Sequence, residues 1–264
     1  MIEASNISKR YGDILAVDHV SFSAGAGEVV GFLGPNGAGK TTTMRILTGF
    51  LPATDGTARI DGHDIFEDPL AARRAVGYLP ESPPLYPEMD VQGYLHYVAK
   101  IKDVPRNQRA EAVDRAMQRC GLADVQRRVI GALSKGFRQR VGIAQAIVHD
   151  PAVLILDEPT VGLDPIQIRE IRALISNLAA PREGARGHTI VLSTHILAEV
   201  EAICRRVILI NNGRKVLDAP LAEITAGGAR LEDAFTRATQ REEPAPQAPA
   251  EPPSDAPALP GASA

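Results

Sequence analysis

One glycine-rich segment constrains the fold of this chain more than any other feature. It matches the pattern G-x-x-x-x-G-K-[ST] in full. Its residues are Gly34, Pro35, Asn36, Gly37, Ala38, Gly39, Lys40, Thr41 and Thr42. An apolar run at residues 29–33, typical of a buried parallel strand, precedes it, and a helix is predicted at residues 42–47. An ordinary glycine-rich turn is the alternative, but the flanking strand and helix favour a phosphate-binding loop in an α/β fold.

The residue types of this loop suit a nucleoside triphosphate. Gly37 and Gly39 permit positive φ angles and close backbone approach, so that successive N–H groups turn toward phosphate oxygens. Lys40 is expected to reach the β- and γ-phosphates, and the Thr41 hydroxyl to bind Mg²⁺. The N-terminus of the following helix adds partial positive charge. We therefore expect ATP and Mg²⁺ as ligands.

Two adjacent carboxylates follow a second apolar run, at residues 153–156. Ligands of open α/β sheets bind at the carboxyl ends of strands, where Asp157 and Glu158 are expected to lie. Asp157 is predicted to hold Mg²⁺, directly or through water, because this cation prefers carboxylate oxygen. Glu158 is predicted to act as the general base on the attacking water. A solvated strand end is the alternative, and the apolar run argues against it.

A histidine, His195, stands at the end of a third apolar run, residues 189–194. Taken alone, a histidine in this position is more often structural than catalytic. In the order of motifs along this chain, we interpret His195 as a γ-phosphate sensor that positions Glu158 and the attacking water.

The segment 133–137, Leu-Ser-Lys-Gly-Phe, resembles the LSGGQ signature of ABC ATPases and precedes a helical pattern. The resemblance implies that two ATPase domains face each other head to tail, as a homodimer or with a paralogous ATPase. The signature of each chain would then close over the ATP bound by the other, with the Ser134 hydroxyl and the Gly136 amide as donors. Lys135, where the family usually has glycine, would add positive charge near those phosphates.

Further residues match the family pattern in order, over about residues 2–220. Tyr11 resembles the aromatic residue that stacks on adenine, although a packing role is the simpler alternative. The segment 162–164 resembles the loop that crosses the dimer interface, where Asp164 would couple the two sites. Glu81 departs from the family, which commonly has a glutamine that senses Mg²⁺ and the attacking water.

Within the family, residues 78–89 and 133–146 resemble the ABC-2 exporter group, which includes ATPases associated with gliding motility, copper-site maturation and multidrug or polysaccharide export. This resemblance implies an ATP-hydrolysing subunit that drives an integral membrane permease on a separate chain. Residues 83–89 are the candidate permease contact, and a plain surface loop is the alternative. Two other function classes stay open. One is a soluble ABC ATPase of DNA repair or of ribosomes, and the other is an ATP-dependent regulator with little hydrolysis.

Composition restricts where such a chain works. The formal net charge of −3 gives no support for nucleic-acid binding. Cys120 and Cys204 have no metal-type spacing, which favours a reducing compartment. The chain begins without signal-peptide character, and no apolar run approaches the roughly 20 residues that span a bilayer. Together with these observations, the resemblance to the ABC-2 exporter group implies a peripheral protein at the cytoplasmic face of the cell membrane.

The predicted fold class is α/β: a P-loop NTPase core with an antiparallel β arm at residues 2–22 and a helical subdomain (the ABC ATPase fold). Residues 1–220 form the predicted ATPase domain, with the helical subdomain at about 85–150. Two helices are predicted there from apolar residues at 3- and 4-residue spacings: Tyr94, Leu95, Val98 and Ile101 in the first, and Ala110, Val113, Ala116 and Met117 in the second. A helical extension at 221–241 and a disordered Pro/Ala-rich tail at 242–264 complete the prediction.

Overall fold

The computed structural model describes residues 1–181 and 187–240, so the predicted tail at 242–264 lies outside the described residues. The strands are β1 (Ile2–Tyr11), β2 (Ile14–Ala24), β3 (Val29–Leu33), β4 (Asp55–Ile60), β5 (His63–Asp64), β6 (Val76–Leu79), β7 (Val153–Asp157), β8 (Thr189–Thr194), β9 (Arg206–Asn211) and β10 (Arg214–Pro220). The helices are α1 (Lys40–Leu47), α2 (Pro69–Arg74), α3 (Val91–Ile101), α4 (Arg109–Arg119), α5 (Lys135–Ile147), α6 (Pro165–Ala179), α7 (Leu197–Ile203), α8 (Leu221–Ile224) and α9 (Leu231–Gln240). Short 3₁₀ turns are η1 (Ala123–Val125), η2 (Ile130–Ala132) and η3 (Ala226–Gly228).

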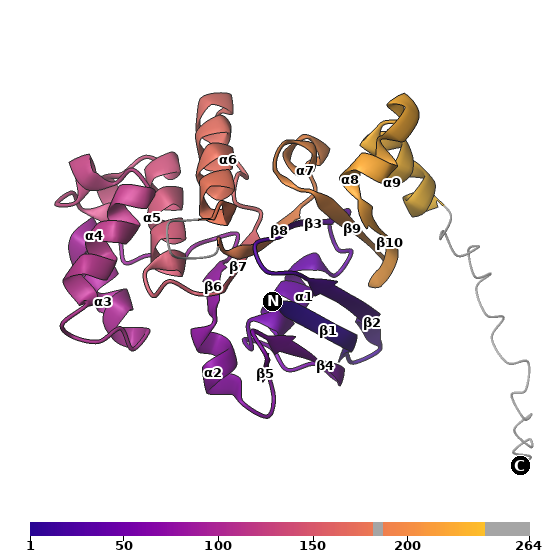
Figure 1. Cartoon of the computed structure of the whole chain (residues 1–264), viewed down its shortest axis with the longest axis horizontal. Helices are drawn as coiled ribbons and strands as arrows, with labels where there is room; N and C mark the ends of the chain where they lie inside the picture. Colours follow the sequence, from indigo (N-terminus) through magenta and orange to yellow (C-terminus); the bar gives the residue numbers. More distant parts are fainter. Residues whose placement is uncertain (182–186, 241–264) are drawn as a thin grey trace, which may run out of the picture.

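The central sheet has the strand order β10-β9-β3-β8-β7-β6. Five strands, from β9 to β6, run parallel, and β10 joins antiparallel to β9. Every residue of β3 and β7 is buried, as expected of parallel strands covered on both faces. Figure 1 shows α1 beneath this sheet and α6 and α7 above it. The predicted phosphate-loop strand and helix are therefore confirmed as β3 and α1.

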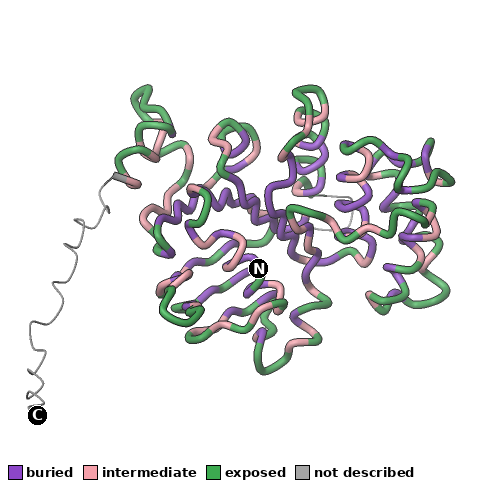
Figure 2. The backbone as a smooth tube through the Cα atoms, turned by 180° about the vertical axis from the view of Figure 1, so that it is seen from behind, coloured by how far each residue is buried: buried purple, intermediate pink, exposed green. Residues whose placement is uncertain are grey.

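A second, antiparallel sheet has the order β2-β1-β4-β5 and confirms the predicted β arm. Its apolar face packs with α1 against one face of the central sheet, where the Phe22 and Phe32 ring centroids lie 5.5 Å apart. The other face of the central sheet packs against the long helices. Figure 2 shows the buried strands running through the middle of the molecule. The phosphate loop thus emerges between two rigid layers.

Helices α3, α4 and α5 pack together at one end of the molecule (Figure 1). Asp90 caps α3 by accepting from the Gly93 amide at 2.8 Å, and buried Leu95 and Val98 face the neighbouring helices. The two helices predicted from apolar spacing are confirmed as α3 and α4, although Ile101 and Ala110 of that pattern are exposed. Each lies in a terminal turn of its helix, beyond the packed region, and the buried positions there are Ala99 and Ala112.

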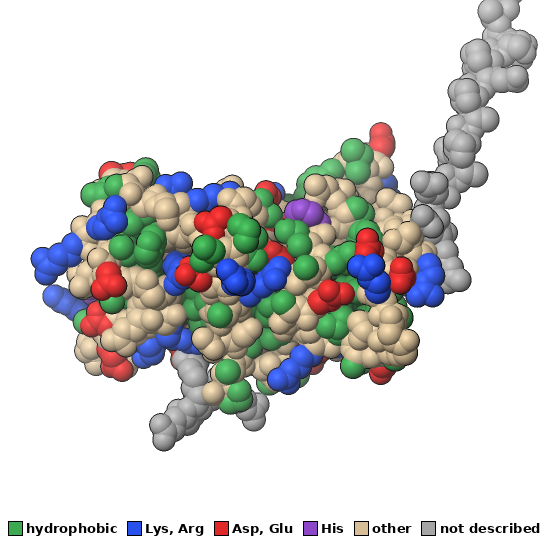
Figure 3. All heavy atoms as spheres, turned by 90° about the horizontal axis from the view of Figure 1, so that it is seen from above, with side chains coloured by type: hydrophobic (Ala, Val, Ile, Leu, Met, Phe, Trp, Pro, Cys, Tyr) green, Lys and Arg blue, Asp and Glu red, His purple; other side chains and the backbone are tan. Residues whose placement is uncertain are grey.

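The last described elements, α8 and α9, pack beside the β9–β10 hairpin. The predicted terminal helix at 231–235 is confirmed and extends to Gln240, with Leu231 buried. The division of the chain near residue 220 stays a prediction. Seen from above, charged side chains of both signs are interspersed with apolar ones (Figure 3). Across the described ranges, no helix combines the length and apolar character needed to span a bilayer.

Candidate functional site

A cavity of about 430 Å³ lies at the carboxyl ends of β3, β7 and β8. It brings together half of the site residues that the sequence singles out. Its lining residues are Ala16, Asn36, Gly37, Gly39, Lys40, Thr41, Thr42, Glu81, Glu158, Val161 and His195. Three loop residues do not line the cavity: Gly34, Pro35 and Ala38. Of these, Gly34 and Ala38 are buried.

The loop conformation requires glycine at two positions. Gly37 and Gly39 have φ angles of 81° and 100°, which residues with a Cβ rarely adopt. A Cβ at Gly39 would in addition collide with the carbonyl oxygen of Ala16 in β2. The loop therefore packs closely against the β arm on one side and continues into α1 on the other. Several of its residues line the cavity.

Lys40, the first residue of α1, is buried with 6% exposure. Its ammonium donates to the carbonyl oxygens of Gly34 at 2.8 Å and Pro35 at 3.1 Å. Burial lowers the pKa of Lys40, and the nearby carboxylates of Glu158, Asp157 and Glu81 oppose this shift. The loop itself therefore holds the cation at the edge where the acidic residues gather.

Glu158 directly follows β7 and has a positive φ of 49°. Its amide donates to the Ser193 carbonyl oxygen at 2.8 Å, which anchors this strained residue to β8. Oε1 lies 2.8 Å from His195 Nδ1, whereas Oε2 is buried and has no hydrogen-bond partner within the described ranges. A carboxylate oriented through one oxygen, with no hydrogen bond on the other, would be suited to accept a proton from a water that reaches it.

Asp157 is fully buried at the end of β7. Both of its carboxylate oxygens are without a hydrogen-bond partner in the described part of the chain. A buried carboxylate is costly unless a cation or a donor compensates it. Asp157 is not among the residues that line the cavity, whereas Thr41 is. The Asp157 carboxylate and the Thr41 hydroxyl are both hard oxygen donors of the kind that Mg²⁺ prefers. The described residues contain no group of three or more His, Cys, Asp or Glu able to hold a metal, so phosphate and water oxygens would complete the coordination.

Tyr11 lies at the end of β1, apart from this cavity. Its side chain is exposed, and the Lys9 ammonium lies 5.4 Å from its ring centroid. The predicted stacking on adenine is compatible with this position on the β arm and stays a prediction.

The signature segment also lies outside the cavity. The Ser134 hydroxyl caps α5 by accepting from the Phe137 amide at 3.3 Å. Lys135 and Gly136 follow in the first turn of α5, and Lys135 packs against Gly162. Asp164 caps α6 by accepting from the Ile166 amide at 2.9 Å, a structural role within its own chain. These residues do not meet the phosphate loop of their own chain.

Sequence reasoning missed several residues at and behind the site. Ala16 and Val161 line the cavity. Behind it, the Glu199 carboxylate accepts hydrogen bonds from the Thr160 and Thr194 hydroxyls. The sequence signal that could have indicated Glu199 is its position four residues after His195. This signal is weak, because acidic residues are common on helix surfaces.

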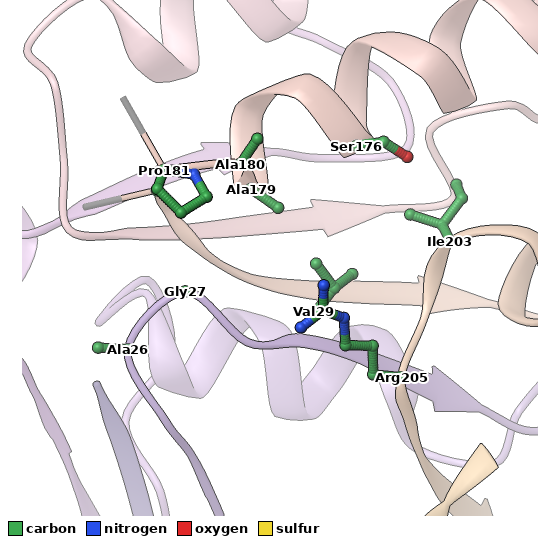
Figure 4. A pocket seen from close by; sticks show the side chains of 10 residues that line it. Ala26, Gly27, Val29, Ser176, Ala179, Ala180, Pro181, Ile203 and Arg205 are labelled. Carbon is green, nitrogen blue, oxygen red and sulfur yellow. The ribbon is translucent and has the colours of Figure 1, made fainter. Parts of the chain in front are cut away.

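A second cavity, of about 760 Å³, lies at the opposite, amino ends of the strands (Figure 4). Val29, at the start of β3, and Ser176 of α6 belong to its wall. Arg205 is the one charged side chain among the described residues that line it. This cavity offers no comparable set of polar groups, so the chemistry points to the smaller one.

Comparisons with known proteins were made for both sequence and fold. The family model described as ABC transporter matches residues 17–161. A second model, described as AAA domain, putative AbiEii toxin, Type IV TA system, matches residues 123–201.

Three curated relatives illustrate the similarity. Bacitracin transport ATP-binding protein BcrA of Bacillus licheniformis is 38% identical over 83% of this chain and 70% of that protein. ABC transporter ATP-binding protein NatA of Bacillus subtilis is 34% identical over 85% of this chain and 91% of that protein. Probable multidrug ABC transporter ATP-binding protein YbhF of Escherichia coli is 33% identical over 88% of this chain and 39% of that protein.

Solved structures agree with these matches. A structure described as the ATP-binding subunit of an ABC transporter superposes with a TM-score of 0.79 at 29% identity, covering 90% of this chain and 99% of that one. The dimeric structure of MJ0796, a bacterial ABC transporter cassette, gives a TM-score of 0.74 at 26% identity, covering 84% and 99%.

Proposed function

Because this chain belongs to the ABC transporter family and is an ATP-binding subunit of that family, we propose that it hydrolyses ATP in a head-to-tail dimer to drive a separate membrane permease. One observation carries the proposal. Glu158 has one carboxylate oxygen beside His195 Nδ1 and Lys40 Nζ, and its other oxygen is without a partner among the described residues. This arrangement stands at the wall of the cavity that the phosphate loop forms.

Different residues at the site would bind the phosphates, bind Mg²⁺ and accept the proton of water. The loop amides and Lys40 bind the β- and γ-phosphates and neutralise their charge. Thr41 and Asp157 hold Mg²⁺, which when bound stabilises negative charge on the phosphate oxygens. Glu158 accepts the proton of the attacking water, and His195 fixes the orientation of Glu158. Glu81, on the cavity wall, contributes a carboxylate where a glutamine is common in the family.

The dimer is supported by the position of the signature. Ser134 and Lys135 are exposed at the start of α5 and do not line the phosphate cavity of their own chain. A helix N-terminus with an exposed serine and a lysine beside it suits a phosphate contributed by a second chain. The similar MJ0796 cassette is described as dimeric. Two copies, or this chain and a paralogue, would then enclose two ATP molecules.

The proposed permease contact is the segment 83–89, which precedes α3. Within it, Tyr86 is 44% exposed and makes edge-to-face contacts with Tyr94 and Tyr97 at centroid distances of 6.1 and 5.7 Å. Such a rigid, exposed aromatic cluster suits a short helix of a partner protein. The transport and multidrug names of BcrA and YbhF support export by a permease of the ABC-2 type. The subunit would then bind the cytoplasmic face of the membrane.

The test is an affinity purification of the Glu158→Gln protein from detergent-solubilised membranes with ATP and Mg²⁺. This change removes the proton acceptor while keeping its size, so the ATP-bound dimer should persist. A polytopic membrane protein recovered at near-equal stoichiometry, together with ATP turnover by the wild-type complex, supports the proposal. Recovery with ribosomes or DNA, or a wild-type protein without turnover, would contradict it. The Glu201→Gln protein, changed at an exposed residue of α7, is the matched control.

A further inference from the structure

Glu199 is an acidic residue buried where the packing alone would favour an apolar one. It lies on α7 with 1% exposure, beside the buried Val200. Both of its carboxylate oxygens are used. Oε1 accepts from the Thr160 hydroxyl, and Oε2 accepts from the Thr194 hydroxyl at 2.8 Å.

One threonine lies in the loop after β7, and the other is the last residue of β8. Thr160 stands two residues after Glu158, and Thr194 immediately precedes His195. The Thr194 hydroxyl also accepts from the Ile196 amide at 3.1 Å, so that contacts on both sides of His195 fix its backbone. His195 Nδ1 in turn contacts Glu158 Oε1 at 2.8 Å. Three side-chain contacts and the backbone between them therefore form a closed ring of Glu158, Thr160, Glu199, Thr194 and His195.

The pKa of Glu199 reflects both its burial and these contacts. Burial raises the pKa of Glu199, the Thr194 hydrogen bond and the Arg172 charge lower it, and the Glu158 charge raises it again. A buried carboxyl group is costly without donors, and here one donor comes from the loop after β7 and the other from the end of β8. Displacement of either loop would leave one oxygen of Glu199 without its partner. The cost of that displacement therefore holds both loops in place.

We infer that Glu199 is a positioning residue that holds the loops after β7 and β8 at the separation at which His195 contacts Glu158. The inference rests on the proposed function for its effect on ATP hydrolysis, but the contact itself can be observed without hydrolysis. Glu199 is absent from the residues that line the phosphate cavity, so it acts on His195 and Glu158 through its contacts with Thr160 and Thr194.

The first test is a double-mutant cycle of ATP turnover with Glu199→Ala and His195→Ala. If Glu199 acts through His195, Glu199→Ala lowers kcat about ten-fold, within the range of coupling between contacting groups, and changes KM for ATP little. In the His195→Ala background it then lowers kcat no further. The control, Glu201→Ala, removes an exposed acid from the same helix and leaves kcat unchanged. If the two losses multiply, Glu199 acts independently of His195, and the inference is overturned.

The second test observes His195 directly in ¹⁵N-histidine-labelled protein by long-range ¹H–¹⁵N correlation. Donation to Glu158 requires the proton on Nδ1, so the wild-type spectrum should show that tautomer for His195. Glu199→Ala should shift His195 toward the Nε2–H tautomer, whereas Glu201→Ala should not. An unchanged tautomer would overturn the inference. A tautomer shift in a protein whose wild type hydrolyses no ATP would uphold the contact while removing the proposed function. If Glu199→Ala does not fold, Glu199→Gln, which keeps only one acceptor oxygen, replaces it in both tests.

Discussion

The Lys40 ammonium lies 3.8 Å from the Glu158 Oε1 atom, and both side chains are more than nine-tenths buried. Lys40 follows β3 and Glu158 follows β7, and these two strands are separated in the sheet by β8. The ion pair therefore joins the phosphate loop to the proposed base across an intervening strand. Removing one member takes away part of what compensates the buried charge of the other.

Replacement of Lys40 by Ala is expected to abolish ATP binding and to lower turnover by at least about 100-fold, because the change removes a buried cation from the phosphates. Fluorescent-nucleotide binding and steady-state turnover measure the two effects. Lys100→Ala, at an exposed position of α3, is the matched control and should retain both activities. Retention of tight ATP binding by Lys40→Ala would show that this loop is not the phosphate site.

Replacement of Asp157 by Asn is expected to raise the free Mg²⁺ concentration needed for half-maximal turnover by about ten-fold or more, because an amide oxygen is a weaker ligand for this hard cation. The measurement is turnover against buffered free Mg²⁺. Chelation with EDTA should stop turnover by the wild-type protein, and added Mg²⁺ should restore it. An unchanged Mg²⁺ requirement in the variant would contradict the assignment of Asp157.

Replacement of Lys135 by Gly, the usual family residue, is expected to raise the ATP concentration needed for dimerisation by up to about five-fold, the range for an exposed charge interaction. Lys135→Arg keeps the charge and should behave as the wild type. Light scattering at increasing ATP concentration gives the midpoint of dimerisation. The difference should vanish at high salt, since exposed charges are screened. A difference that persists at high salt would point to packing against Gly162 instead.

His149 is expected to make stability fall at acidic pH. Burial, and then the Lys102 charge, lower the pKa of His149 from 6.5 to about 4 in the folded chain. The unfolded chain therefore binds a proton first, so this contribution is complete above pH 6.5 and is lost as the pH falls toward 4. Between pH 7.5 and pH 5 the wild type should lose about 2 kcal/mol through this group.

Urea unfolding of the wild type and of His149→Gln at both pH values measures that loss. Glutamine keeps a donor for the Val76 carbonyl oxygen, which His149 Nε2 contacts at 3.1 Å, but it does not titrate. The variant should therefore lose less stability on acidification. Equal losses in both proteins would exclude His149 as the cause.

The elements predicted from sequence were those with a local signal. The strand before Gly34 and the helix after Lys40 carry their pattern within a few residues. The capping roles of Ser134 and Asp164 were not predicted, although each side chain bonds an amide only two or three residues ahead. Ile101 and Ala110 fit the helical spacing but are exposed, because burial at a helix end depends on how far the neighbouring helix extends.

By itself, the sequence determined that this chain has a phosphate loop after a buried strand, an acidic pair and a histidine at strand ends, and a signature before a helix. These features depend on residue order and backbone preference over short distances. Only the tertiary structure decided which of them meet. The approach of His195 to Glu158 and the use of both Glu199 oxygens arise from the parallel pairing of β7 with β8 and the packing of α7. Such contacts join residues far apart in the chain, and no sequence period records them.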